Sequence, residues 1–331
     1  MVKPHHPPPY RAVPVYPVQP RSGNEINGLG LRDKVRARHV FHTNPAYGPH
    51  SWLLLNRFFT SLSTWATVTG RIRVVWWMRR AVGPVAKLKR AVTDPGAMAA
   101  EVKERAKGFG AGVVGITRLT EMAQYEHSNL PYHTAICIGI PMDRVEMSEV
   151  PQPRSAAEVM KVYGDVARNV VLLAEWIRAQ GWQAKAYGDS QSTDILQIPL
   201  AIEAGLGTLG KHGSIIGKEY GSNYRLGTVV TDMPLALDAP VDIGVDDLCA
   251  TCRRCTIDCP ADAISDARQW VRGEEKWYVD FDKCVPYFSI TGGCAICIEV
   301  CPWSEEGRGE MLSQQLLKKR GARTRQAVAA E

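Results

Sequence analysis

The sequence predicts an α+β protein in which an α/β body is followed by a small cysteine-rich module. From residue 94 onward, helical and extended segments alternate along the chain. Eight of the nine cysteines lie between Cys249 and Cys301. The 331 residues are 45% hydrophobic and 22% charged, which is enough to bury a sizeable core in one large or two ordinary domains.

The charge balance and the apolar pattern argue against two classes of protein. Lysine and arginine number 40 against 34 aspartate and glutamate, and this surplus of +6 does not by itself predict nucleic-acid binding. No apolar run reaches the roughly 18 residues of a transmembrane helix. The first residues show neither the apolar stretch of a signal peptide nor a twin-arginine leader. We therefore expect a cytoplasmic protein, with peripheral membrane contact as an option.

Two unusual segments precede the body. Residues 1–50 carry seven prolines near their start, which predicts an extended arm along the body or a disordered segment. Residues 51–93 form an aromatic and basic helical segment, in which tryptophans such as Trp65 and Trp76 alternate with arginines. This segment is either a surface for a membrane or a partner protein, or an aromatic core with a solvated basic face.

The body is predicted to span residues 94–244. Asp94 followed by Pro95 is a good helix start, and this helix should end near Lys107. A long amphipathic helix is predicted over Ser155–Gln180. The other expected elements are strands at Ala111–Thr117, Thr134–Ile140 and 182–187, a short helix in 195–205 and a strand within 224–235. The polar tail, residues 304–331, should end in a basic helix.

Two cysteine motifs define the module at residues 245–303. The first has the spacing C-x2-C-x2-C-x3-C-P, which is the run found in bacterial ferredoxins. It consists of Cys249, Cys252, Cys255, Cys259 and Pro260. The second keeps the C-x2-C-x3-C-P ending but has its first cysteine further upstream. It consists of Cys284, Cys294, Cys297, Cys301 and Pro302.

This double pattern predicts two 4Fe–4S clusters. Zinc closes with four ligands, usually in two spaced pairs, and a disulfide framework belongs to a short secreted chain. In the ferredoxin pattern the last cysteine of each run binds the other cluster. The first cluster is therefore expected on Cys249, Cys252, Cys255 and Cys301, and the second on Cys259, Cys284, Cys294 and Cys297. The ninth cysteine, Cys137, lies within a predicted strand and is expected in the core.

A glycine-rich loop with the pattern G-x-G-x-x-G follows the short helix of the body. The dinucleotide-binding fingerprint needs a preceding strand and a following helix, whereas here a helical segment comes first. Glycines still let backbone N–H groups approach a ligand closely, so the tail of a cofactor could bind here. The candidate cofactor contacts are Gly205, Gly207, Gly210, Lys211, His212 and Gly213.

Three long segments of the chain resemble the cobalamin-dependent reductive dehalogenases. They are Pro199–Leu235, Leu248–Ile264 and Lys276–Trp303, in this order. Epoxyqueuosine reductases share the glycine loop and the two cysteine motifs. In them, however, the stretch before the last motif is much longer than the nine residues between Cys284 and Cys294. The short spacing favours the dehalogenase side.

The resemblance implies a nitroreductase-like α/β domain that binds a corrinoid base-off, without a protein ligand on cobalt. The sequence agrees, since it has no Asp-x-His-x-x-Gly motif. His212 is then expected to be structural or to contact the cofactor tail. In this family the clusters reduce the cobalt, the cobalt attacks the halogen or the carbon, and a tyrosine supplies the proton.

Tyr163 is the first candidate for this proton donor and Tyr187 is the second. The leaving carbon needs an acid within hydrogen-bond reach, and a free tyrosine, with a pKa near 10, needs a neighbouring cation to serve as that acid. Lys211 and Arg225 are the candidate cations.

The identity of the acid stays open because this sequence departs from the family in one stretch. Many family members carry an asparagine in the stretch that corresponds to Gly188–Asp194, and this chain has none there. Asp189 or Asp194 is an alternative acid, unless these residues serve a turn or a helix cap.

We therefore interpret the chain as a corrinoid- and iron–sulfur-dependent reductase acting on a small organohalide, with an aromatic one as an option. Its electrons should come from a separate ferredoxin, flavodoxin or reductase, and residues 51–93 would be the dock for that donor or a membrane contact. No nucleic-acid partner is expected. Three alternatives stay open: an epoxyqueuosine reductase-like enzyme acting on tRNA, a two-cluster electron carrier without corrinoid, and a dehydrogenase that binds a nucleotide at the glycine loop.

Overall fold

A four-stranded antiparallel sheet forms the centre of the body in the computed structural model, which describes residues 22–40, 64–189 and 194–328. The strand order is β1-β2-β6-β3. The strands are β1 (Val113–Arg118), β2 (Thr134–Pro141), β6 (Tyr224–Thr231) and β3 (Ala184–Tyr187). Because every neighbouring pair is antiparallel, the expected α+β class is confirmed, and the finer nitroreductase-like description stays an expectation.

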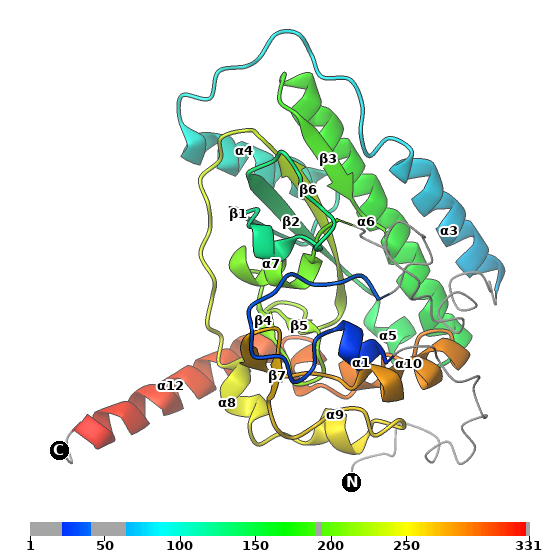
Figure 1. Cartoon of the computed structure of the whole chain (residues 1–331), viewed down its shortest axis with the longest axis vertical. Helices are drawn as coiled ribbons and strands as arrows, with labels where there is room; N and C mark the ends of the chain where they lie inside the picture. Colours follow the sequence, from blue (N-terminus) through cyan, green and yellow to red (C-terminus); the bar gives the residue numbers. More distant parts are fainter. Residues whose placement is uncertain (1–21, 41–63, 190–193, 329–331) are drawn as a thin grey trace.

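Helices cover both faces of this sheet (Figure 1). The long helix α6 (Pro153–Ala179) and α4 (Pro95–Gly108) lie on one face, and α7 (Gln197–Glu203) lies on the other. Helix α3 (Trp65–Met78) packs along the outer side of α6. The short helix η2 (Glu121–Ala123) follows β1 in the chain, and the short helix α5 (Arg144–Met147) follows β2. The helices expected from Asp94 and over Ser155–Gln180 are thus present as α4 and α6.

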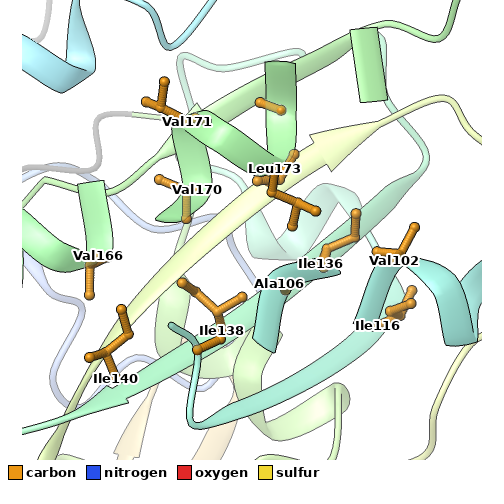
Figure 2. Close-up of a cluster of buried hydrophobic side chains, with 14 of the residues drawn as sticks. Val102, Ala106, Ile116, Ile136, Ile138, Ile140, Val166, Val170, Val171 and Leu173 are labelled. Atoms are coloured by element: carbon orange, nitrogen blue, oxygen red, sulfur yellow. The ribbon is translucent and has the colours of Figure 1, made fainter. Parts of the chain in front are cut away.

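The alternation of β2 divides its side chains between two apolar layers. Ile136, Ile138 and Ile140 lie in the layer beneath α4 and α6, which Figure 2 shows together with Val166 and Val170 of α6. Cys137 points into the other layer, beneath α7, as expected of a core residue. Burial raises the pKa of the Cys137 thiol to about 12.

Gly227 of β6 lets α6 approach the sheet closely. A Cβ atom at this position would lie 2.6 Å from Cγ1 of Val166 and 2.8 Å from Cγ1 of Val170. The strand and the helix are therefore in contact without an intervening side chain at this point.

The cysteine module lies at one end of the sheet (Figure 1). It comprises α8 (Val245–Cys249), α9 (Arg254–Ile257), β7 (Gln269–Val271), β8 (Glu274–Lys276), α10 (Phe281–Ile290), α11 (Ile296–Glu299) and η3 (Pro302–Ser304). A small hairpin of β4 (Thr208–Leu209) and β5 (Ile215–Ile216) comes from the body. Helix α12 (Arg308–Val328) follows the module and projects away from it.

Residues 22–40 run from the module to the body. Helix α1 (Gly23–Ile26) begins at Ser22, and the Asn24 side chain donates a hydrogen bond to the carboxylate of Asp280 at 2.8 Å. Further along, Ala37 pairs with Tyr125 of the body in a parallel bridge. The described part of the expected N-terminal arm therefore lies against both units, and the rest of residues 1–50 falls outside the described residues.

Helix α3 bears on the two alternatives for residues 51–93, a contact surface or an aromatic core with a solvated basic face, and shows features of both. Trp65 is 79% exposed, Ile72 59% and Trp76 50%. Arg73 and Arg80 pair with acidic residues of α6, with Asp165 at 2.7 Å and with Glu175 at 3.1 Å. Val74 is buried, and Trp77 and Met78 pack against the core, so α3 has apolar side chains both inside and outside; residues 51–63 are not described.

Among the described residues, none of the helices combines the length and the apolar character needed to cross a bilayer.

We predict that Gly227→Ala lowers the free energy of unfolding by about 1–3 kcal/mol, because the added methyl group overlaps Val166 and Val170. Anaerobic urea unfolding would measure this change. The matched control is Gly108→Ala at the end of α4, where a Cβ atom meets nothing within 4 Å. Equal stability of the two variants would contradict the close packing of β6 on α6.

Candidate functional site

Four cysteines from both motifs line one pocket at the junction of the module and the body. They are Cys249, Cys252, Cys255 and Cys301, the set expected for the first cluster. The rest of its wall is formed by Lys211, His212, Leu248, Arg254, Pro302 and Trp303. Burial and the neighbouring thiols raise the pKa values of Cys255 and Cys301 to about 12. Iron must displace protons from these thiols, so the pocket favours the thiolates only when metal is bound.

The remaining four cysteines form a second set. Burial, and next the thiols of Cys284 and Cys259, raise the pKa of Cys294 to about 12. Burial and the same two neighbours, together with Cys294, raise the pKa of Cys297 well above its ordinary value. The structure thus brings together Cys259, Cys284, Cys294 and Cys297, the set expected for the second cluster.

Short helices and tight turns present these thiols. Cys249 ends α8, Cys255 lies on α9 and Cys297 lies on α11. The chain enters α11 through Ala295, whose φ of 53° is left-handed, after Gly293 with a φ of 104°. These turns let the cysteines of one short segment point inward together, which is what a cubane cluster requires of its ligands.

Lys211 belongs to the first cysteine pocket. Its side chain is 1% exposed, and its ammonium donates hydrogen bonds to the carbonyl of Cys252 at 2.8 Å and to Asp266 at 3.0 Å. The prediction that Lys211 assists Tyr163 is therefore wrong in this structure, because the ammonium is already held by the module. This role was predicted from the position of Lys211 in the glycine loop, and that position does not determine the direction of the side chain.

His212 is buried in a hydrogen-bond network. The backbone N–H of Ser214 donates to its Nδ1 at 3.2 Å, and the hydroxyl of Ser222 donates to the carbonyl of Ile215 at 2.7 Å. The Nε2 of His212 must then carry the proton and donate to the oxygen of Ser222, which lies at 3.2 Å. Burial lowers the pKa of His212 to about 4. Both nitrogens are committed, which agrees with a structural role and not with a cobalt ligand.

The glycines of the loop are explained by close packing of the chain on itself. A Cβ atom at Gly207 would lie 2.1 Å from the carbonyl oxygen of Ile216, and one at Gly205 would lie 2.7 Å from that of Ala239. Gly210 and Gly213 pack in the same way against Ile216 and Val279. The loop follows helix α7 and continues into strand β4, so it lacks the strand-to-helix context of a dinucleotide fold. Its contact with a cofactor tail stays a prediction.

Tyr163 and Arg225 face each other between α6 and the sheet. The guanidinium carbon of Arg225 lies 5.5 Å from the centre of the Tyr163 ring, within the range of a cation–π contact. Arg225, on β6, is two residues before Gly227, so it points to the same face of the sheet, the one covered by α6. The structure thus joins the first-choice tyrosine with one of its two candidate cations.

Two buried polar atoms beside this pair have no partner among the described residues. They are the Nε of Arg225 and the Oδ1 of Asn223. Asn223 is held by a hydrogen bond of 2.8 Å from its amide nitrogen to the carbonyl of Met142. Sequence reasoning missed Asn223, although the alternation of a strand would have placed it on the same side as Arg225. A water molecule or a polar ligand could satisfy this donor and this acceptor.

Tyr187 belongs to a different cluster. Its hydroxyl donates to Asp194 at 2.7 Å, and Asp194 also accepts from Lys185 at 2.6 Å and from Ser128 at 3.1 Å. Burial and the bond to Asp194 raise the pKa of Tyr187, which makes it a poorer acid than a free tyrosine. The structure therefore argues against Tyr187 as the proton donor.

The carboxyl of Asp194 is kept ionised. Burial alone would raise its pKa, but the hydrogen bonds from Lys185 and Tyr187 outweigh burial and lower it. An ionised carboxylate cannot donate a proton. Asp194 is therefore the shared hydrogen-bond acceptor of this cluster and not an acid. Asp189 borders residues 190–193, which lie outside the described residues, and its role as an acid stays a prediction.

Comparisons with known proteins agree with these features. Residues 248–304 match the family described as the 4Fe-4S dicluster domain. The chain is 29% identical to the tetrachloroethene reductive dehalogenase of Sulfurospirillum multivorans over 262 residues, which cover 64% of this chain and 51% of that protein. It is 33% identical to the enzyme of the same name from Dehalobacter restrictus over 168 residues, 47% of this chain and 30% of that protein.

The epoxyqueuosine reductase of Salmonella typhimurium is also similar, with 31% identity over 192 residues, 48% of this chain and 47% of that protein. Among solved structures, the catabolic reductive dehalogenase NpRdhA has the same fold, with a TM-score of 0.71 and 24% identity over 78% of this chain and 40% of that one. The expected resemblance to reductive dehalogenases is confirmed. The chain spans about half the length of the first of these relatives, 51%.

We predict that Cys301→Ser removes the same cluster as Cys249→Ser, although the two cysteines belong to different motifs. The reason is that both line the first pocket, whereas Cys297 lies in the second set. Iron content and EPR spectra of the reduced variants would measure this. Cys297→Ser serves as the control and should leave the other cluster. If Cys301→Ser instead gave the spectrum of Cys297→Ser, each motif would bind its own cluster.

We predict that Asp194→Asn destabilises the protein by about 1.5–3 kcal/mol, because Lys185 loses a charged partner in a half-buried place. Tyr187→Phe, which leaves that ion pair intact, should cost about 1 kcal/mol. The folded-state pKa of Asp194 is lowered, so its contribution is present above the unfolded value near 4 and is lost as the pH falls through the folded value. Urea unfolding at neutral and acidic pH would show whether the difference between wild type and Asp194→Asn shrinks in acid; a constant difference would contradict this.

Proposed function

We propose that this protein, whose body and module resemble those of the reductive dehalogenases, is a corrinoid- and iron–sulfur-dependent reductase that removes halogen from an organohalide. The observation that carries the proposal is the Tyr163–Arg225 pair, set beside two unpaired polar atoms in the layer between α6 and the sheet. The overall reaction takes two electrons and one proton: the carbon–halogen bond breaks, a carbon–hydrogen bond forms and halide leaves.

The apolar cluster beside the proposed site extends to the second cysteine set. Val162, next to Tyr163, belongs to the same buried cluster as Ile296, and Cys294 packs against that cluster. At the start of α6, Ala156 lies against Gly292. On the same side, Arg144 of α5 binds the carboxylate of Glu299 on α11 at 3.0 Å. We assign the two cysteine sets as ligands of two 4Fe–4S clusters, which would deliver single electrons to this layer.

Two buried polar atoms of the proposed site match the polar groups of a corrinoid. Its periphery carries carboxamide groups, each with a donor and an acceptor, and the unpaired Nε of Arg225 and Oδ1 of Asn223 are a matching donor and acceptor. Among the candidate cofactor contacts of the glycine loop, the glycines would meet its tail, since the side chains of Lys211 and His212 are bonded within the protein. When bound, the corrinoid supplies the strongly reducing cobalt centre that can cleave a carbon–halogen bond.

Tyr163 is the proposed proton donor. Its ring lies 5.5 Å from the guanidinium carbon of Arg225, within the range of a cation–π contact. Arg225 therefore acts on Tyr163 through charge. Tyr187 and Lys211 do not share this place, because their polar groups are held by Asp194 and by the module.

An external ferredoxin, flavodoxin or reductase is the proposed electron donor. The outward apolar side of α3, formed by Trp65, Ile72 and Trp76, supports the proposal that this part of residues 51–93 contacts a partner or a membrane surface. A cytoplasmic location and the absence of a nucleic-acid partner stay predictions. A structure of NpRdhA contains 3-bromo-4-hydroxybenzoic acid, which supports an aromatic halide as a substrate to test first.

Retention of a corrinoid is the first measurement. The protein would be reconstituted anaerobically with iron, sulfide and hydroxocobalamin, desalted, and examined by EPR. We expect a stoichiometric base-off Co(II) signal. Both clusters without corrinoid would contradict the proposal and favour the two-cluster electron carrier. Conversion of epoxyqueuosine in tRNA without release of halide from any organohalide would favour the second candidate, which the similarity to the Salmonella enzyme supports.

We predict that Tyr163→Phe lowers the rate of halide release by about 10²–10⁴-fold while corrinoid and clusters are retained, because the general acid is removed. Arg225→Met should lower both the rate and the retention of corrinoid. Halide release with a low-potential chemical reductant would measure the rates. The control is Tyr132→Phe, at a tyrosine in the apolar layer on the α7 side of the sheet, which should stay near the wild-type rate. A Tyr163→Phe enzyme as fast as this control would rule Tyr163 out.

A further inference from the structure

We infer that Lys211, a residue of the body, is a positioning residue that sets the reduction potential of the first cluster. The inference rests on the proposed assignment of that cluster to Cys249, Cys252, Cys255 and Cys301. Lys211 lies in the pocket with these four cysteines. It would stabilise the reduced cluster and so raise its potential above that of a cluster without this cation.

The side chain of Lys211 is committed to the cluster side of the pocket. Its ammonium donates to the carbonyl of Cys252 at 2.8 Å, lies 5.1 Å from the centre of the Trp277 ring and is shielded from solvent. The ammonium thus lies against the backbone of one proposed ligand residue, out of contact with solvent.

A buried cation next to a cluster acts mainly on the reduced state. Reduction adds one negative charge to the cluster, and the attraction between that charge and the ammonium is strong where solvent does not screen it. Cluster potentials depend on net charge, on hydrogen bonds to the sulfurs and on solvent exposure. Lys211 supplies the first of these, a positive charge, at the first pocket.

Asp266 partly offsets this cation. Its carboxylate accepts from Lys211 at 3.0 Å, and also from Arg253 at 2.7 Å and Thr256 at 3.0 Å. The Asp266 side chain is 39% exposed, so it can be changed with less risk to the fold than the buried lysine. Removing its charge leaves Lys211 less compensated, which predicts a shift of the potential opposite in sign to the removal of Lys211 itself.

EPR-monitored redox titration of the reconstituted protein tests the inference without corrinoid or organohalide. We expect Lys211→Met to lower the equilibrium constant for reduction of one cluster about tenfold, which is about 59 mV for a one-electron couple. Asp266→Asn should raise the potential of the same cluster. The second cluster should keep its potential in both variants. Cys255→Ser, which should keep only the second cluster, identifies which of the two titration waves belongs to it.

Lys218→Met is the matched control, since Lys218 lies on the surface and pairs with Glu310 at 2.7 Å. Both potentials should be those of the wild type. Unchanged potentials in Lys211→Met with both clusters present would overturn the inference and leave Lys211 a structural residue. If Lys211→Met does not fold, Asp266→Asn decides alone, and an unchanged or lowered potential overturns the inference. Failure of the ligand assignment would appear separately, as a Cys255→Ser variant that keeps both clusters.

Discussion

The packing of α6 on β6 is the constraint on which the rest of the structure depends. The absence of a side chain at Gly227 lets Val166 and Val170 come down onto the strand. This close approach fixes the height of α6 over the sheet, and with it the position of Tyr163 above Arg225. A wider gap between helix and strand would separate the tyrosine from its cation, because both side chains start from these two backbones.

Two polar contacts join the body to the module, one at each cysteine set. Lys211 reaches from the body into the first set, through Cys252 and Asp266. Arg144 reaches from α5 to Glu299, which lies on the helix that carries Cys297 of the second set. Each cysteine set thus has one cation of the body bonded to the segment that carries it, so the body helps to position both sets.

Local pattern sufficed wherever the relevant physics is local. The cap at Asp94 and the apolar stripe from Ser155 to Gln180 predicted α4 and α6 correctly, because caps and periodicity act within one element. The pattern left two interpretations of α3 open. The structure exposes Trp65 and Trp76 while Trp77 packs against the core, and this division depends on how α3 lies on α6, about ninety residues away in the chain.

The sequence by itself determined that the chain has two runs of cysteine ligands, an α+β body and a tyrosine among a few candidate acids, because ligand spacing and side-chain periodicity are properties of short segments. Only the tertiary structure decided which polar groups meet. In the folded chain Lys211 bonds to the module, Tyr187 bonds to Asp194, and Arg225 lies against the ring of Tyr163. A long side chain reaches its partner across elements far apart in the sequence, and that choice depends on how those elements pack.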